Sequence, residues 1–201
     1  MLFSSFVAAS ILSLASAAPA AISKRWPAPD GSSLTPSAIS IYHGQNGAIV
    51  YNVAKGEVSR EQSNGKDKST LVTFDLKGKT LGSTCSLKFF HDNADTSAIF
   101  TGSPAQFDIF RSLQPAPTAG SPGWGGPGNQ RDIHLGRLEP KYNGNAVIVT
   151  NVGPNQLGGF PCPKVGDYYV KNGLVGFEIV PVGDRVSAEW NAALSGLYLD
   201  W

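Results

Sequence analysis

Charge is scarce in this chain and is not clustered: 16 Lys and Arg face 15 Asp and Glu among 201 residues, a formal net charge of +1. Contact with nucleic-acid phosphates needs clustered Lys and Arg, so the absence of a basic run excludes nucleic acid as an expected partner. Long hydrophobic runs are also missing. The apolar stretch Phe6 to Leu14 is short, whereas a membrane-spanning helix needs about 20 apolar residues. We therefore expect no membrane span.

The same short apolar stretch has the form of a secretory signal. The small residues Ala15, Ser16 and Ala17 follow it, which predicts cleavage after Ala17 and a signal peptide over residues 1–17. The dibasic pair Lys24-Arg25 then predicts a leader over 18–25, with an ordinary charged pair as the alternative. A single domain over 26–201 remains, and we expect it in the extracellular space or the cell wall. No Asn-x-Ser/Thr triplet is present, so N-glycosylation is not expected.

Cysteine is limited to Cys85 and Cys162, which are 77 positions apart. Secreted chains mature under oxidising conditions, and an even count leaves no unpaired thiol. Neither residue has the neighbouring His or Cys that a zinc site requires. We therefore predict that the two form a disulfide.

Glycine and proline are abundant, with 23 and 14 copies, and they separate short runs in which apolar and polar residues alternate. Alternation with a period of two is typical of strands that have one buried face. The clearest alternating runs are 72–76, 85–89, 107–109, 175–179 and 186–190, and further short strands are expected over 39–42, 48–53, 133–138, 146–151 and at the C-terminal end, 196–201. This pattern predicts an all-β fold, an antiparallel β-sandwich of the jelly-roll type, with one disulfide.

The segment from Gln114 to Gln130 interrupts the strand pattern. It holds five Gly, four Pro and one aromatic residue, Trp124. Seventeen residues is more than a compact domain usually spends on one connection, so we expect this loop to be either functional or mobile.

Several short motifs occur in an order that resembles a known fungal family, the C-terminal domain of ubiquitin 3 binding protein. The motifs are Thr84–Phe89, Gly102–Phe110, Trp124 with Pro127, Leu135-Gly136, Phe160–Pro163, Val175–Glu178 and Ser195–Leu199. The resemblance covers residues 70–201. It implies a secreted or cell-surface fungal β-sandwich with one disulfide and no established enzyme chemistry. The family's name implies a partner in ubiquitin-like conjugation, but that machinery is cytosolic and a secreted chain would rarely meet it.

Metal-ligating residues are few and scattered. Asp92, Asn93 and Asp95 form an oxygen-rich segment that could bind Ca2+, although the same residue types are favoured in turns, where they bond their own backbone. Turn formation is the preferred interpretation. His43, His91 and His134 have no metal-ligand spacing, so no zinc, copper or other cofactor is expected.

Catalytic signatures are equally sparse, because the chain lacks Gly-x-Ser-x-Gly and the disulfide consumes both thiols. Glu178 and Glu189 are the candidate pair for a glycosidase, whose carboxyl groups lie about 5 to 5.5 Å apart in retaining enzymes and 6.5 to 9.5 Å in inverting ones. Both fall at outward strand positions, where Glu is ordinarily solvated. Catalysis is therefore not the expected activity.

Aromatic residues supply the remaining candidates for binding. Trp124, Tyr142 and the pair Tyr168-Tyr169 have the composition of a lectin-like face, on which sugar rings stack. Aromatics of β proteins are also common in cores and cross-strand pairs. We expect a non-enzymatic extracellular protein that binds wall polysaccharide or a protein partner, with a glycan-cleaving hydrolase or lyase on the same scaffold as the alternative.

Overall fold

The computed structural model describes residues 31–61, 66–117, 123–124 and 127–201, and all regular elements within these ranges are strands. Every strand pairing is antiparallel, which confirms the predicted all-β class. None of the described segments forms a helix long and apolar enough to cross a membrane. The signal, leader and Lys24-Arg25 predictions lie outside the described residues.

Two sheets build the fold. The larger contains, in order across it, β12 (Val147–Ile148), β10 (Arg131–Glu139), β8 (Gln106–Ser112), β14 (Leu174–Val182), β5 (Lys68–Asp75), β2 (Ala38–His43), β3 (Ala48–Val50) and β9 (Gly123–Trp124). From β5 it continues through β4 (Lys55–Arg60) and β15 (Val186–Asn191) to β7 (Ile99–Thr101). The smaller contains β1 (Ser33–Leu34), β16 (Gly196–Asp200), β6 (Thr84–His91) and β11 (Gly144–Asn145), with β13 (Phe160–Pro161) also paired to β6.

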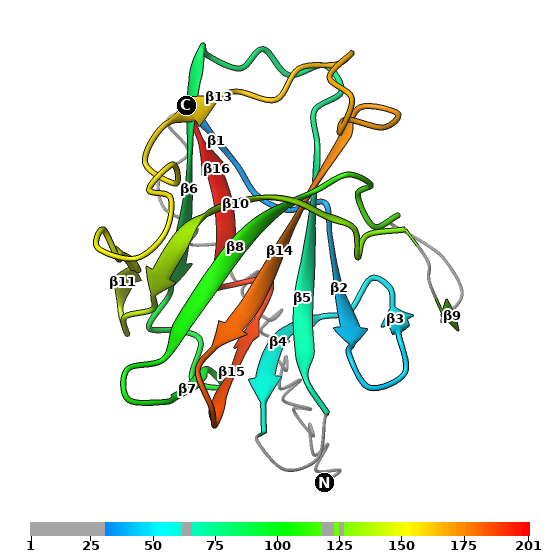
Figure 1. The fold of residues 1–201 in the computed structure, drawn as a ribbon. Coiled ribbons are helices and arrows are strands. Elements are labelled where there is room, and N and C mark those ends of the chain that lie inside the picture. The colour runs from blue at the N-terminus through cyan, green and yellow to red at the C-terminus, as the bar shows by residue number, and fades with distance from the viewer. Residues whose placement is uncertain (1–30, 62–65, 118–122, 125–126) are drawn as a thin grey trace, which may run out of the picture.

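The two sheets enclose one aromatic-rich core. In Figure 1, β8, β14 and β5 run side by side across the front, with β16 and β6 behind β10. Trp190 of β15 packs against Phe89 of β6, with ring centroids 5.1 Å apart, and against Phe107 of β8 at 6.5 Å. All three side chains are fully buried. The larger sheet is therefore curled. Its β8 and β14 form one layer of the sandwich, and its β15 lies across the core from them, in the layer of the smaller sheet.

Core-facing positions follow the predicted alternation. Val186, Ala188 and Trp190 are buried, and the intervening residues of β15 are partly exposed. Gly56 lies opposite Trp190 in the ladder between β4 and β15. A methyl group at this glycine would lie 2.1 Å from the indole ring, so the ring occupies the space that a side chain would need. The glycine is therefore a packing requirement of this strand pair.

The outer face of the larger sheet differs from the expectation, because outward-pointing residues at its centre are buried. Thr73 is fully buried, and its hydroxyl donates to the carbonyl of Ala116 at 2.7 Å. At Gly176 an added Cβ would lie 2.7 Å from Cα of Pro115. The start of the loop predicted over 114–130 thus crosses the outer face and shields it from water.

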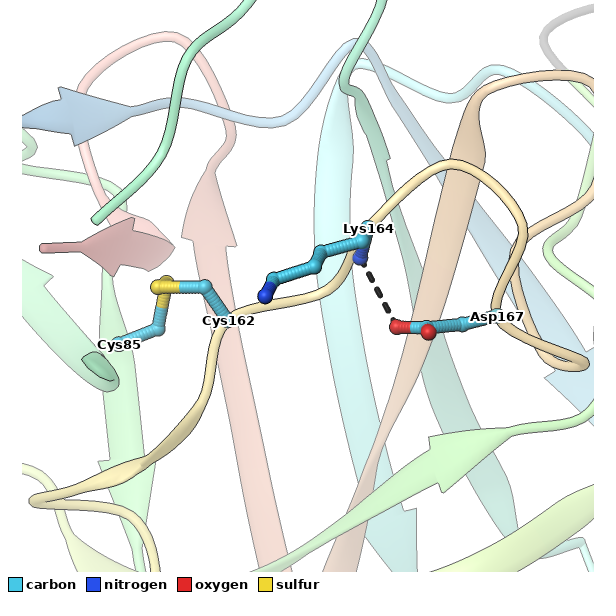
Figure 2. The surroundings of a disulfide bond; sticks show 4 residues. All are labelled: Cys85, Cys162, Lys164 and Asp167. Carbon is cyan, nitrogen blue, oxygen red and sulfur yellow. Dashed lines mark hydrogen bonds between the residues drawn. A yellow bond between two sulfur atoms is a disulfide. The ribbon is translucent and has the colours of Figure 1, made fainter. Parts of the chain in front are cut away.

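Cys85 and Cys162 form the predicted disulfide, with Cα atoms 4.8 Å apart and both residues buried. Cys85 pairs with Phe160 in the β6–β13 ladder, which places Cys162 just beyond the end of β13. Figure 2 shows the bridge and the turn that follows it, where the amide of Lys164 donates to Oδ2 of Asp167 at 2.9 Å. The bond fastens the segment leading to β14 onto the smaller sheet.

Two predicted strands are shorter than expected, and one strand of six residues was missed. The strand expected over 48–53 ends at Val50, and Asn52 adopts a left-handed conformation with φ of 53°. The strand expected over 146–151 is only Val147–Ile148, because the chain changes sheets here: β11 pairs with β6, whereas β12 pairs with β10. β4 was not predicted, since Lys55–Arg60 contains only one large apolar residue, Val58.

Candidate functional site

Two groups of candidate residues that are about 50 positions apart in the sequence meet beside β6. Asp92 follows the end of β6, and Tyr142 precedes β11, whose Gly144 pairs with His91 of β6. A shallow hollow of about 270 Å³ lies at this junction. It is lined by Phe90, His91, Asp92, Asn93 and Asn143.

A buried histidine holds the two segments together. His91 is 3% exposed, and its Nδ1 accepts a hydrogen bond from the backbone amide of Asn143 at 2.9 Å. Since Nδ1 acts as acceptor, a neutral ring carries its proton on Nε2, which faces the carbonyl of Asp95 at 3.4 Å. Asn143 has a φ of 59°, a left-handed conformation that asparagine tolerates better than most residues. This bend places Tyr142 over His91.

Tyr142 offers the aromatic surface of the site. Its ring lies 5.2 Å from the ring of His91 and 5.1 Å from that of Phe100, yet the residue remains 58% exposed. The hydroxyl accepts a hydrogen bond from the backbone amide of Phe100 at 3.1 Å. Phe100 belongs to β7, whose one partner among the described strands is β15, so the tyrosine also caps the edge of β7. The ring is thus fixed in place while much of its surface stays open to solvent.

Asp92 of the hollow and the nearby Asp95 are bonded within the protein. Oδ1 of Asp92 accepts from the amide of Ala94 at 2.8 Å, and the carboxylate of Asp95 accepts from the hydroxyl of Ser97 at 2.8 Å. These two local contacts agree with the turn interpretation. Asp95 also accepts from the amide of Asn191 at 2.8 Å, which joins this segment to the end of β15. Across the described parts of the chain, no three His, Cys, Asp or Glu residues group in a way that could hold a metal ion, so the Ca2+ interpretation of Asp92, Asn93 and Asp95 gains no support.

The hollow presents amides and aromatic rings and no cation. Asn93 and Asn143 are exposed, and in the described structure no protein group bonds to either side-chain amide. Each amide can both donate and accept, which suits the hydroxyl and amide groups of a sugar. A second hollow of about 230 Å³, between the start of β2 and the end of β15, has no aromatic residue in its lining. Of these two hollows, the first has open polar groups in its lining and an exposed aromatic ring, Tyr142, directly beside it in the chain.

The other predicted aromatic residues lie elsewhere. The structure describes the backbone of Trp124, which pairs with Ala48 of β3. Its side chain does not belong to the described part of the structure. Tyr168 and Tyr169 contact Arg111, whose guanidinium lies 3.8 Å from the ring centroid of Tyr169. Burial raises the pKa of Tyr169 to about 12. Tyr169 is therefore a packing residue.

Asp132 completes this network at the end of the larger sheet. Its Oδ2 accepts from Nη2 of Arg111 at 2.6 Å and from the hydroxyl of Tyr168 at 2.7 Å. Burial alone would raise the pKa of Asp132, but the hydrogen bonds from Tyr168 and Arg111 outweigh it and lower that pKa. The network ties the segment after the disulfide to β8 and β10.

The candidate catalytic pair is not assembled. Glu178 alternates with the core residues Phe177 and Ile179 of β14, so it lies on the outer face of the larger sheet. Glu189 alternates with Ala188 and Trp190 of β15, on the opposite side of the core. The expectation that Glu178 is solvated was wrong, because it is 1% exposed. The two carboxylates point away from the core in different layers and do not flank a common substrate position.

Sequence reasoning missed Phe90 and Asn143 of the hollow and Phe100 beside Tyr142, and it considered His91 only as a histidine without metal-ligand spacing. The one local signal was Tyr142 directly before Asn143-Gly144, a dipeptide typical of tight turns. Nothing in the sequence showed that this turn would rest on the end of β6. Compared with known proteins, the chain matches no family model and no curated protein.

Proposed function

We propose that this chain is a secreted fungal protein that binds wall polysaccharide without cleaving it, through the hollow beside Tyr142. The observation that carries the proposal is the exposed, fixed ring of Tyr142 next to the open amides of Asn93 and Asn143. Sugars are bound in this way, with an aromatic ring against the apolar face of the pyranose and amides on its hydroxyl groups.

Three further features support the extracellular part of the proposal. The first 17 residues have the form of a secretory signal, the chain contains a disulfide, and the ordered motifs resemble a secreted fungal family. The lining of the hollow contains no Lys or Arg, which favours a neutral glycan such as chitin or β-glucan over an acidic one.

A pull-down on insoluble chitin, β-glucan and cellulose tests the proposal, with released sugars measured in the supernatant. Tyr142→Ala should lose binding, whereas Tyr142→Phe should retain it because the ring remains. Tyr168→Ala is the matched control, since Tyr168 is also 58% exposed but belongs to the Arg111 network. Trp124→Ala tests the other aromatic candidate.

Each outcome has a distinct meaning. Binding that Tyr142→Ala abolishes, without sugar release, supports the proposal. Sugar release would favour the hydrolase or lyase alternative. Binding that only Trp124→Ala abolishes would move the site to the 114–130 loop, and absence of binding to all three polymers would favour a protein partner and overturn the proposal.

A further inference from the structure

The outer face of the larger sheet carries a second group of polar residues, on different strands from the hollow. Cross-strand register aligns one full row here, formed by His134, Phe110, Glu178, Leu71 and Ser40. Arg137, Asp108 and Val180 align beside it on β10, β8 and β14, and Ser69 pairs with Tyr42 between β5 and β2. Arg131 lies at the start of β10, and its guanidinium is 5.1 Å from the ring centroid of Phe110. The ring of His134 stacks on the same phenylalanine at 4.7 Å.

The carboxylates of this face are occupied by internal donors. Glu178 accepts from the hydroxyl of Ser69 at 2.5 Å, and from Nε and Nη2 of Arg131 at 2.7 and 2.9 Å. Asp108 accepts from Nε and Nη2 of Arg137 at 2.8 and 3.0 Å, and its Oδ1 lies 3.2 Å from Nε2 of His134. The carboxylates therefore have few acceptor positions left for an external ligand.

The arginines, in contrast, retain donors. A guanidinium has five N–H groups, and the contacts to Glu178 engage only the Nε–H and one N–H of Nη2 of Arg131. No other acceptor within the described residues binds this guanidinium, and 44% of the side chain is exposed. Hydrogen bonding to Glu178 raises the pKa of Arg131, so the group stays cationic. Tyr42, which pairs with Ser69 between β2 and β5, is partly exposed on the same face.

We infer that this outer face is a second binding site, in which Arg131 receives the carboxylate of an acidic saccharide such as a uronic acid. A planar guanidinium fixed along one edge by a buried carboxylate presents its other donors in a set orientation, which matches the planar carboxylate of a ligand. Phe110, on which Arg131 and His134 both rest, supplies apolar surface beside the guanidinium. The site is independent of the neutral-glycan hollow and stands if the proposed function fails.

Affinity electrophoresis of the full chain in gels containing polygalacturonate tests the inference, with fully methyl-esterified polygalacturonate as the neutral counterpart. Native protein should be retarded by the free acid and not by the ester. Arg131→Gln alone would leave Glu178 unpaired, so the test variant is Arg131→Gln with Glu178→Gln, and its folding is verified by thermal unfolding. Its dissociation constant should rise at least tenfold.

Two further variants separate specific recognition from charge attraction. Arg131→Lys keeps the charge but loses the forked donors, and it should also bind at least fivefold more weakly. Arg60→Gln is the matched control, because Arg60 is paired with Asp67 and 36% exposed at the end of β4. It should bind as the native protein does. The inference would be overturned if the native protein were retarded equally by acid and ester, or by neither. It would also be overturned if the double variant or Arg131→Lys bound as the native protein does, or if Arg60→Gln lost as much affinity as those two variants.

Discussion

The outer face of the larger sheet and the hollow beside β6 are both polar. They differ in whether their polar side chains already form hydrogen bonds within the protein. On the outer face, Glu178 and Asp108 each accept two hydrogen bonds from an arginine. In the hollow, the amides of Asn93 and Asn143 extend into solvent. Removing a group from the first region leaves a partner unpaired, so it should cost stability. Removing one of these two amides should cost only binding.

The disulfide should produce the largest effect, and it acts on both regions alike. Replacing both cysteines with serine removes a cross-link spanning 77 positions, which should lower the free energy of unfolding by about 4 to 5 kcal/mol. Urea titration of the variant and the native protein measures this. The constraint acts mainly on the unfolded chain, so the folded fraction should bind glycan as before. A loss below about 1 kcal/mol would contradict this account.

Glu178→Ala should have the next largest effect and tests the bonded region directly. The change removes both contacts to Arg131 and leaves a void beneath it, so the free energy of unfolding should fall by about 3 kcal/mol. Asn93→Ala is the counterpart in the hollow and should change stability by less than about 0.5 kcal/mol. Equal effects of the two changes in chemical denaturation would remove the distinction between the regions.

Gly56→Ala examines the core that supports both regions. The added methyl group would meet the indole of Trp190, and overpacking of this kind costs about 2 kcal/mol. Gly78→Ala is unsuitable as a control because its φ of 67° disfavours alanine. Gly158→Ala meets only Ile148, at 3.5 Å, and should cost much less. Similar melting temperatures for the two alanine variants would show that the indole can move aside.

Asp132→Asn should have the smallest effect, and one that depends on pH. The pKa of Asp132 is lower in the folded protein than its usual value of 3.8, so its contribution to stability is present above pH 4 and is lost as pH falls toward the folded-state pKa. The difference in melting temperature between native and variant should thus be largest near neutral pH. It should shrink below about pH 4. A difference that grows in acid would contradict the assigned hydrogen bonds.

Residues that act within one strand were predictable from the sequence. Val186, Ala188 and Trp190 identify β15 by alternation alone, because a strand with one buried face repeats every two residues. Cys85 and Cys162 were also predictable, since only two cysteines are available to pair. The all-β class rests on such local signals.

Contacts between distant segments were not predictable. Glu178 occupies an outward strand position, and its contacts come from Arg131, 47 positions earlier, and from Ser69, 109 positions earlier. The hollow depends on a hydrogen bond between His91 and Asn143, which are 52 positions apart. Tyr142 was identified as a candidate ligand residue from its type, but its neighbour Phe100 gave no local signal. The site is a product of the sheet topology, which the sequence pattern does not specify.

The central claim is that the exposed ring of Tyr142 binds a neutral glycan, and the most direct test is a binding isotherm of native protein, Tyr142→Ala and Tyr142→Phe on insoluble chitin and β-glucan. We expect Tyr142→Ala to bind at least one of these polymers about tenfold more weakly than native protein, a loss of about 1.4 kcal/mol, and Tyr142→Phe to bind within about twofold. Native-like binding by Tyr142→Ala, at unchanged melting temperature, would contradict the account.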